Sequence, residues 1–90
     1  MNIKKAKEII KSVLKGREEF LKFSWGNFKS TVGKRNMYQS TVEKISLDTL
    51  IELLEHPEIK NVYFHPSVAP PGHGTDGIAL RYRIYFEFKK

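Results

Sequence analysis

Arg81, Arg83 and Tyr85 carry the chemistry that this sequence displays most clearly, because two cations and an aromatic ring recur at every second position. Guanidinium groups neutralise phosphates, and an exposed aromatic ring stacks on an unpaired base for about 1–3 kcal/mol. Successive side chains of a β-strand point to opposite sides of a sheet, so this spacing places all three residues on one face. The pattern predicts a surface that binds an acidic macromolecule, with RNA or single-stranded DNA as the first candidate.

A second group of cations lies in the first half of the chain. Lys34 and Arg35 are adjacent in a predicted turn at residues 33–36, and lysines alternate with aromatic residues around that turn. We expect Lys34 and Arg35 to add phosphate contacts to the same surface. The neighbouring Trp25 and Phe28 are expected in the core instead, because a domain of this size needs its large side chains inside.

Histidines near a run rich in proline and glycine suggest two further kinds of chemistry. His65, His73 and Asp76 could hold a metal ion, or two histidines beside the arginines could cleave a phosphodiester as acid and base. Next to proline or glycine, however, histidine is an ordinary residue of turns and strand ends. We therefore predict no catalytic residue, no metal site and no cofactor, and we place His73 in the binding surface. The glycine-rich run 72–77 is no phosphate cradle, because a predicted strand follows it where a cradle needs a helix.

Composition narrows the class of partner. The net charge of the 90 residues is +6, and residues 1–45 hold 11 of the 16 Lys and Arg but only 4 of the 10 Asp and Glu. Such a basic surface most often meets nucleic acid and, next, an anionic protein face. The chain has no cysteine for a disulfide framework or a thiolate metal site. No apolar run approaches the ~20 residues of a membrane helix. We expect a cytoplasmic protein that has no membrane partner.

Two segments have the periodicity of helices. Residues 2–15 repeat apolar side chains at steps of three and four, with Asn2 as the N-cap and Gly16 as the left-handed residue after the helix. A second helix begins after Ser46, another N-cap residue, and ends at His56, which precedes a proline. Its apolar stripe consists of Leu47, Leu50, Ile51 and Leu54.

The remaining segments are predicted strands and loops. Residues 17–35 fit either a helix or a strand, and we favour a strand at 18–25. Residues 37–45 and 61–65 have the composition of strands, the second bounded by Pro66. Residues 78–88 alternate strictly, with an inward face of Ile78, Leu80, Tyr82, Ile84, Phe86 and Phe88. Residues 66–77 must form a loop, since three prolines and three glycines interrupt any regular structure.

This order of elements, α-β-β-α-β-β, predicts the fold class. We expect residues 1–90 to form a single α+β domain, an antiparallel sheet of three or four strands with two helices packed on one face. The other face then carries Arg81, Arg83 and Tyr85 in solvent. A long strand over 78–88, if it lies at an edge of the sheet, could pair with a second copy and form a homodimer.

We expect a non-catalytic binding module that engages its partner through the basic sheet face and the loop 66–77, and two alternatives stay open. The same surface could dock on a protein or nucleoprotein partner, as in an accessory or inhibitor protein of a phage or plasmid. The chain could also be a small RNase that uses His65 or His73 with the two arginines. Its size, its basicity and its Arg-Tyr-Arg-Ile-Tyr-Phe segment resemble the ribonuclease toxins of toxin–antitoxin pairs. Those toxins usually begin with a strand, whereas this chain begins with a predicted helix, and the resemblance assigns no site.

Overall fold

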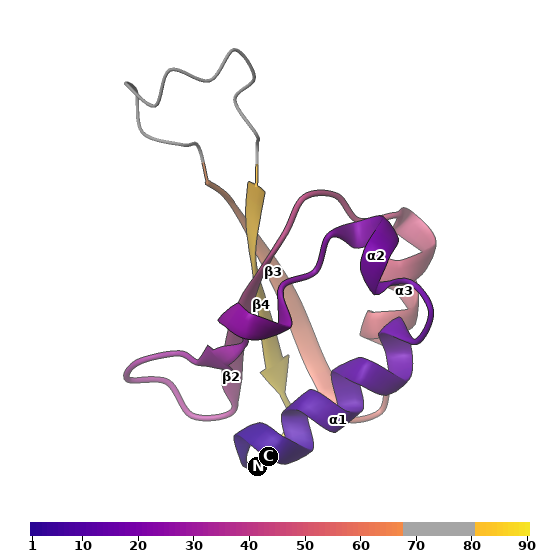
Figure 1. Cartoon of the computed structure of the whole chain (residues 1–90). Coiled ribbons are helices and arrows are strands. Elements are labelled where there is room, and N and C mark those ends of the chain that lie inside the picture. The colour runs from indigo at the N-terminus through magenta and orange to yellow at the C-terminus, as the bar shows by residue number, and fades with distance from the viewer. Residues whose placement is uncertain (68–80) are drawn as a thin grey trace, which may run out of the picture.

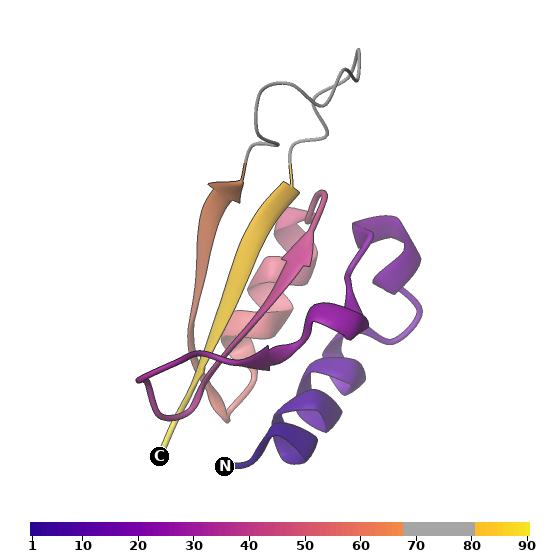
Figure 2. The ribbon, with the colours of Figure 1, turned by 60° about the vertical axis from the view of Figure 1, so that its left-hand side comes forward.

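The computed structural model of the chain describes residues 1–67 and 81–90. Their elements are α1 (Ile3–Leu14), α2 (Glu18–Leu21), the 3-10 turn η1 (Trp25–Asn27), β1 (Lys29–Ser30), β2 (Met37–Val42), α3 (Leu47–Glu55), β3 (Ile59–Ser67) and β4 (Arg81–Phe88). The strands form one antiparallel sheet in the order β1-β2-β4-β3, and the helices lie on one face of it (Figures 1 and 2). The predicted α+β fold is confirmed.

Helix α1 forms where the periodicity predicts it. Ala6, Ile10 and Leu14 are buried on its inner face, because their spacing of four brings them to one side of a helix. The Asn2 side chain accepts a hydrogen bond of 2.8 Å from the backbone N–H of Lys5, which satisfies one of the unpaired donors of the first turn. Gly16 follows the helix at φ +77°, a conformation that favours glycine.

Residues 18–25 do not form the strand that we favoured. Residues 18–21 form α2, Lys22 ends this helix at φ 53°, and η1 begins at Trp25. The segment makes two strand-like backbone bonds near the end of β2, from Ser24 N–H to the Thr41 carbonyl (3.1 Å) and from Glu43 N–H to the Leu21 carbonyl (3.0 Å). Leu21 and Phe23 are buried, so tertiary packing decides between two patterns that the local sequence fits equally well.

The core lies between the helices and the inner face of the sheet. Ile84, Phe86 and Phe88 on β4 are buried, and so are Tyr38, Ser40 and Val42 on β2. The period-two pattern is thus confirmed from Ile84 onward, but Tyr82 is 38% exposed and does not continue the buried face. The expected inward residues 78 and 80 lie outside the described part of the chain.

The order of the strands corrects two expectations. β4 pairs with β2 on one side and with β3 on the other, so residues 81–88 form a central strand rather than an edge available to a second copy. β3 is an edge strand and runs through Pro66 to Ser67, beyond the predicted boundary. Proline is tolerated there because an edge strand can lack a ladder donor. The greater part of the predicted loop 66–77, including His73 and Asp76, lies outside the described residues.

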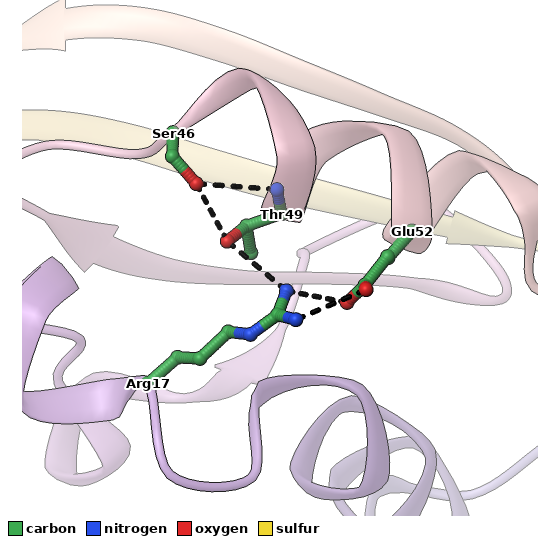
Figure 3. A network of polar contacts seen from close by, with 4 residues as sticks. All are labelled: Arg17, Ser46, Thr49 and Glu52. Carbon is green, nitrogen blue, oxygen red and sulfur yellow. Dashed lines mark hydrogen bonds and ion pairs between the residues drawn. The ribbon is translucent and has the colours of Figure 1, made fainter.

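Helix α3 begins and ends as predicted, but it is rotated relative to the expected stripe. The Ser46 hydroxyl accepts a bond of 3.2 Å from Thr49 N–H, and the helix ends before Pro57. Thr49 and Leu53 face the core, whereas Leu47, Ile51 and Leu54 are exposed. Arg17 helps to fix this rotation. Its guanidinium donates a hydrogen bond of 3.3 Å to the Thr49 hydroxyl and one of 3.0 Å to the Glu52 carboxylate (Figure 3). Within residues 1–67 and 81–90, no helix has the length and apolar character to cross a membrane.

Candidate nucleic-acid interface

The face of the sheet that the helices leave uncovered, here called the open face, is built from alternate residues of the four strands. The register places Arg83 opposite Thr41 of β2 and His65 of β3, and Tyr85 opposite Gln39 and Tyr63. Residues directly opposite in an antiparallel pair point to the same side. The open face therefore includes Lys29, Met37, Gln39, Thr41, Asn61, Tyr63, His65, Arg81, Arg83, Tyr85 and Glu87.

Three rings gather at the centre of the open face. Tyr63 and Tyr85 are cross-strand neighbours, and His65 meets the Tyr85 ring edge to face with 5.3 Å between the centroids. Tyr63 is 39% exposed, His65 is exposed and Tyr85 is half-buried. These rings therefore present accessible aromatic surface beside the arginines.

Arg81 and Arg83 are both exposed on this face. Arg81 lies 3.9 Å from the Glu43 carboxylate, and the two side chains are 57% and 40% exposed. An exposed pair at that distance contributes at most about 1 kcal/mol, so the Arg81 guanidinium stays available to a ligand. Arg83 makes no ion pair with any residue in the described ranges 1–67 and 81–90.

Glu87 gives one end of the open face a different character. The Tyr63 hydroxyl donates a hydrogen bond of 2.8 Å to the Glu87 carboxylate, and Lys60 lies 3.9 Å from the same group. The hydrogen bond to Glu87 raises the pKa of Tyr63 above its ordinary value, and burial adds to the rise. The hydrogen bond from Tyr63 to Glu87 thus fixes the position of the Tyr63 hydroxyl and favours its protonated form.

Lys34 and Arg35 reach the open face from the turn between β1 and β2. Both are exposed, and they line one shallow depression together with Tyr63, His65 and Tyr85. The structure therefore brings Lys34, Arg35 and Tyr85 together, although they are some fifty residues apart in sequence. A second depression runs beside it, and its lining includes the cations Lys29 and Arg83 and the polar groups of Asn27, Gln39 and Thr41.

The aromatic residues expected in the core are not on this face. Phe28 is buried, with its ring parallel to that of Tyr38 at 5.9 Å between centroids. Trp25 is half-buried against the core, and the ammonium groups of Lys7 and Lys11 on α1 lie 5.9 and 5.6 Å from its ring centroid. Trp25 therefore makes its cation–π contacts with α1, on the side of the sheet opposite the open face.

The two rings that accompany Tyr85, those of Tyr63 and His65, are not among the predicted site residues. From the sequence, His65 is a candidate only for an acid, a base or a metal ligand. Both belong to the period-two set Asn61, Tyr63 and His65, which is the available signal in the sequence. Only the register with β4 shows that these residues lie beside Arg83 and Tyr85, and no local pattern in the sequence predicts this register. His73 is the one predicted site residue that lies outside the described residues.

The open face combines the cations Arg81 and Arg83 with the rings of Tyr63, His65 and Tyr85. Within residues 1–67 and 81–90, no three His, Cys, Asp or Glu side chains gather closely enough to hold a metal ion. His65 contacts the Tyr85 ring and lies opposite Arg83. Comparison of the chain with protein-family models, with curated proteins and with solved structures found no match.

Proposed function

We propose that the protein is a non-catalytic module that binds single-stranded nucleic acid, RNA or DNA, on its open face. The observation that carries the proposal is the cluster of Tyr63, His65 and Tyr85 rings beside the exposed cation Arg83. Rings alone would suit many apolar partners, and cations alone would suit any anion. Together on one surface they match a chain that offers bases and phosphates at a regular spacing.

The positions of the cations suit a nucleic-acid backbone that crosses the β-strands of the open face. Lys34 and Arg35 stand at one side of the ring cluster, in the same depression as Tyr85. Lys29 and Arg83 line the neighbouring depression. A strand that runs from one depression to the other therefore meets cations at both ends and rings between them. We assign phosphate contacts to the cations and stacking to the two tyrosines.

Single strands are favoured over duplexes because of the rings. A tyrosine on a sheet surface can stack only on a base whose face is free, and the faces of duplex bases are already covered by their neighbours. Each stacked base contributes about 1–3 kcal/mol. A duplex would keep only the phosphate contacts, which are independent of the rings.

Fluorescence anisotropy with labelled oligonucleotides tests the proposal. We expect the wild type to bind a single strand more tightly than the matched duplex. Tyr85→Ala should weaken single-strand binding by about 5- to 150-fold, which corresponds to 1–3 kcal/mol. Phe20→Ala is the matched control, because Phe20 is 73% exposed on α2 and lies away from the open face.

Two outcomes would contradict the proposal. One is the absence of oligonucleotide binding at every salt concentration, which would point to a protein partner instead. The other is an equal loss of affinity in Tyr85→Ala and Phe20→Ala. The same samples test for cleavage: we expect labelled RNA to remain intact on incubation, and a product that disappears in His65→Ala would identify the protein as an RNase.

A further inference from the structure

The outer edge of β3 is available for pairing. β3 hydrogen-bonds with β4 on one side, and no residue in ranges 1–67 and 81–90 pairs with its other side. The segment 61–65 carries no Lys, Arg, Asp, Glu or Pro, whereas Lys60 and Pro66 stand at its two ends. Lysine and proline are the residues that natural edge strands use against further pairing. Here Lys60 and Pro66 flank five residues, 61–65, none of which carries such a feature against pairing.

Helix α3 stands beside this edge. It contacts β3 and α1, and Figures 1 and 2 together show α3 on the β3 side of the helical layer and α1 on the β2 side. The contacts of Arg17 with Thr49 and Glu52 mark the flank of α3 that faces α1 and α2 (Figure 3). At 3.6 residues per turn, Leu47 and Leu54 lie on the opposite flank. They therefore face outward, past the edge of the sheet.

The exposed side chains on that flank are apolar. Leu47 is 69% exposed, Leu54 45% and Ile51 42%. On the helical side of β3 itself, Val62 and Phe64 are only partly buried against the core. Together these residues form an apolar strip that extends from the edge of β3 along the outer flank of α3. The strip consists of Leu47, Ile51, Leu54, Val62 and Phe64. An apolar helix flank next to an open strand edge is the surface that an extended sheet and a further helix would cover.

We propose that a second copy of this chain covers the strip, with the two β3 strands paired antiparallel about a two-fold axis centred on Tyr63. The sheet then continues from one subunit into the other, and the leucines of the two α3 helices pack together. This proposal goes beyond the proposed function and does not depend on it.

Self-complementarity favours a second copy as the occupant. Pairing centred on Tyr63 places Val62 opposite Phe64 of the second copy and Asn61 opposite His65 of the second copy, so no like charges meet across the axis. An isologous contact of this kind closes after two subunits. The open face lies on the other side of the sheet from α3, so the dimer leaves it accessible and joins two such faces.

The molar mass of the full chain in solution tests this inference. We expect light scattering after size exclusion to give twice the chain mass of 10.5 kDa. Leu47→Asp and Leu54→Asp should each halve the measured mass, because they place a carboxylate in the apolar contact. Phe20→Asp is the matched control: its side chain is more exposed than Leu47 but lies on α2, so this variant should remain dimeric. Circular dichroism checks that all three variants keep the wild-type spectrum.

Cross-linking tests the strand pairing itself, and the chain has no cysteine to interfere. Tyr63→Cys places a thiol on the two-fold axis, where residues directly opposite have Cα atoms about 4.5–5.5 Å apart, within reach of a disulfide. Mild oxidation should therefore give a covalent dimer. Tyr85→Cys, on the adjacent central strand, should not cross-link. A monomeric wild type would overturn the proposal, and so would a dimer that Tyr63→Cys fails to cross-link.

Discussion

The His65 ring meets the Tyr85 ring edge to face, with 5.3 Å between centroids and 86° between planes. The histidine comes from the edge strand β3 and the tyrosine from the central strand β4. Such aromatic pairs are worth about 0.5–1.5 kcal/mol beyond their burial. The contact therefore limits the positions that the Tyr85 ring can take on the open face.

A conservative series at Tyr85 separates its ring from its hydroxyl. Tyr85→Phe keeps the π-face and should bind a single-stranded oligonucleotide within about twofold of the wild type, since stacking uses the ring. Tyr85→Leu keeps apolar bulk but removes the π-face, and its affinity should fall by about tenfold or more. Anisotropy titrations at one fixed salt concentration measure both. Equal affinities for the Phe and Leu variants would mean that the ring does not stack.

The salt dependence of binding should report on Arg83. For a single strand, the slope of log K against log salt changes by about 0.7 for each phosphate contact. We expect Arg83→Ala to reduce the slope by about that amount, whereas Arg83→Lys, which keeps the charge, should leave it near the wild-type value. Lys4→Ala supplies the control, because Lys4 is exposed on α1. A slope that changes equally in Lys4→Ala would show a response to net charge alone.

The hydrogen bond between Tyr63 and Glu87 should make the stability of the fold depend on pH in the alkaline range. It raises the pKa of the Tyr63 phenol in the folded chain above the value of about 10 in the unfolded chain. The stabilisation is thus complete below about pH 10 and is lost as the pH rises through the folded pKa. In a tyrosine absorbance titration, Glu87→Ala should move one late-titrating component toward pH 10. Burial also raises the pKa of Tyr38, and this second late component should not move in Glu87→Ala.

Arg17 should contribute measurably to stability through α3. It bonds both Thr49 and Glu52, and the side chains of the ion pair are 36% and 46% exposed. We expect a double-mutant cycle of Arg17→Met and Glu52→Gln in urea unfolding to give a coupling of about 0.5–1 kcal/mol. The same cycle on Arg81 and Glu43, which lie 3.9 Å apart and are more exposed on the cationic side, should give a coupling near zero. Comparable values for the two pairs would contradict this ranking.

Local signals in the sequence predict the ends of the long helices and the alternation of the last strand. Asn2 and Ser46 act as caps because their side chains need only the backbone N–H three residues later. Ile84, Phe86 and Phe88 alternate inward because the pleat of a strand dictates it. These features depend on neighbours along the chain, so one sequence suffices to predict them.

What the sequence does not predict depends on partners far away in the chain. Leu21 and Phe23 have both helical and strand spacing, and only their burial against the rest of the core decides the outcome. The stripe on α3 was expected from apolar spacing alone, whereas the observed rotation buries Thr49 and Leu53. Tyr63 joins the candidate site through a register with Tyr85 that no local pattern encodes.

The central position of β4 has a consequence for any molecule that meets the open face. A strand with hydrogen-bonded neighbours on both sides cannot shift without breaking two ladders, so its backbone belongs to the least mobile part of a domain. Arg83 and Tyr85 are attached to the part of β4 that pairs on both sides, and the distance between their Cα atoms is fixed before an encounter. Binding then costs little ordering of the main chain. An incoming molecule would therefore meet a fixed main chain, on which only the side chains can adjust.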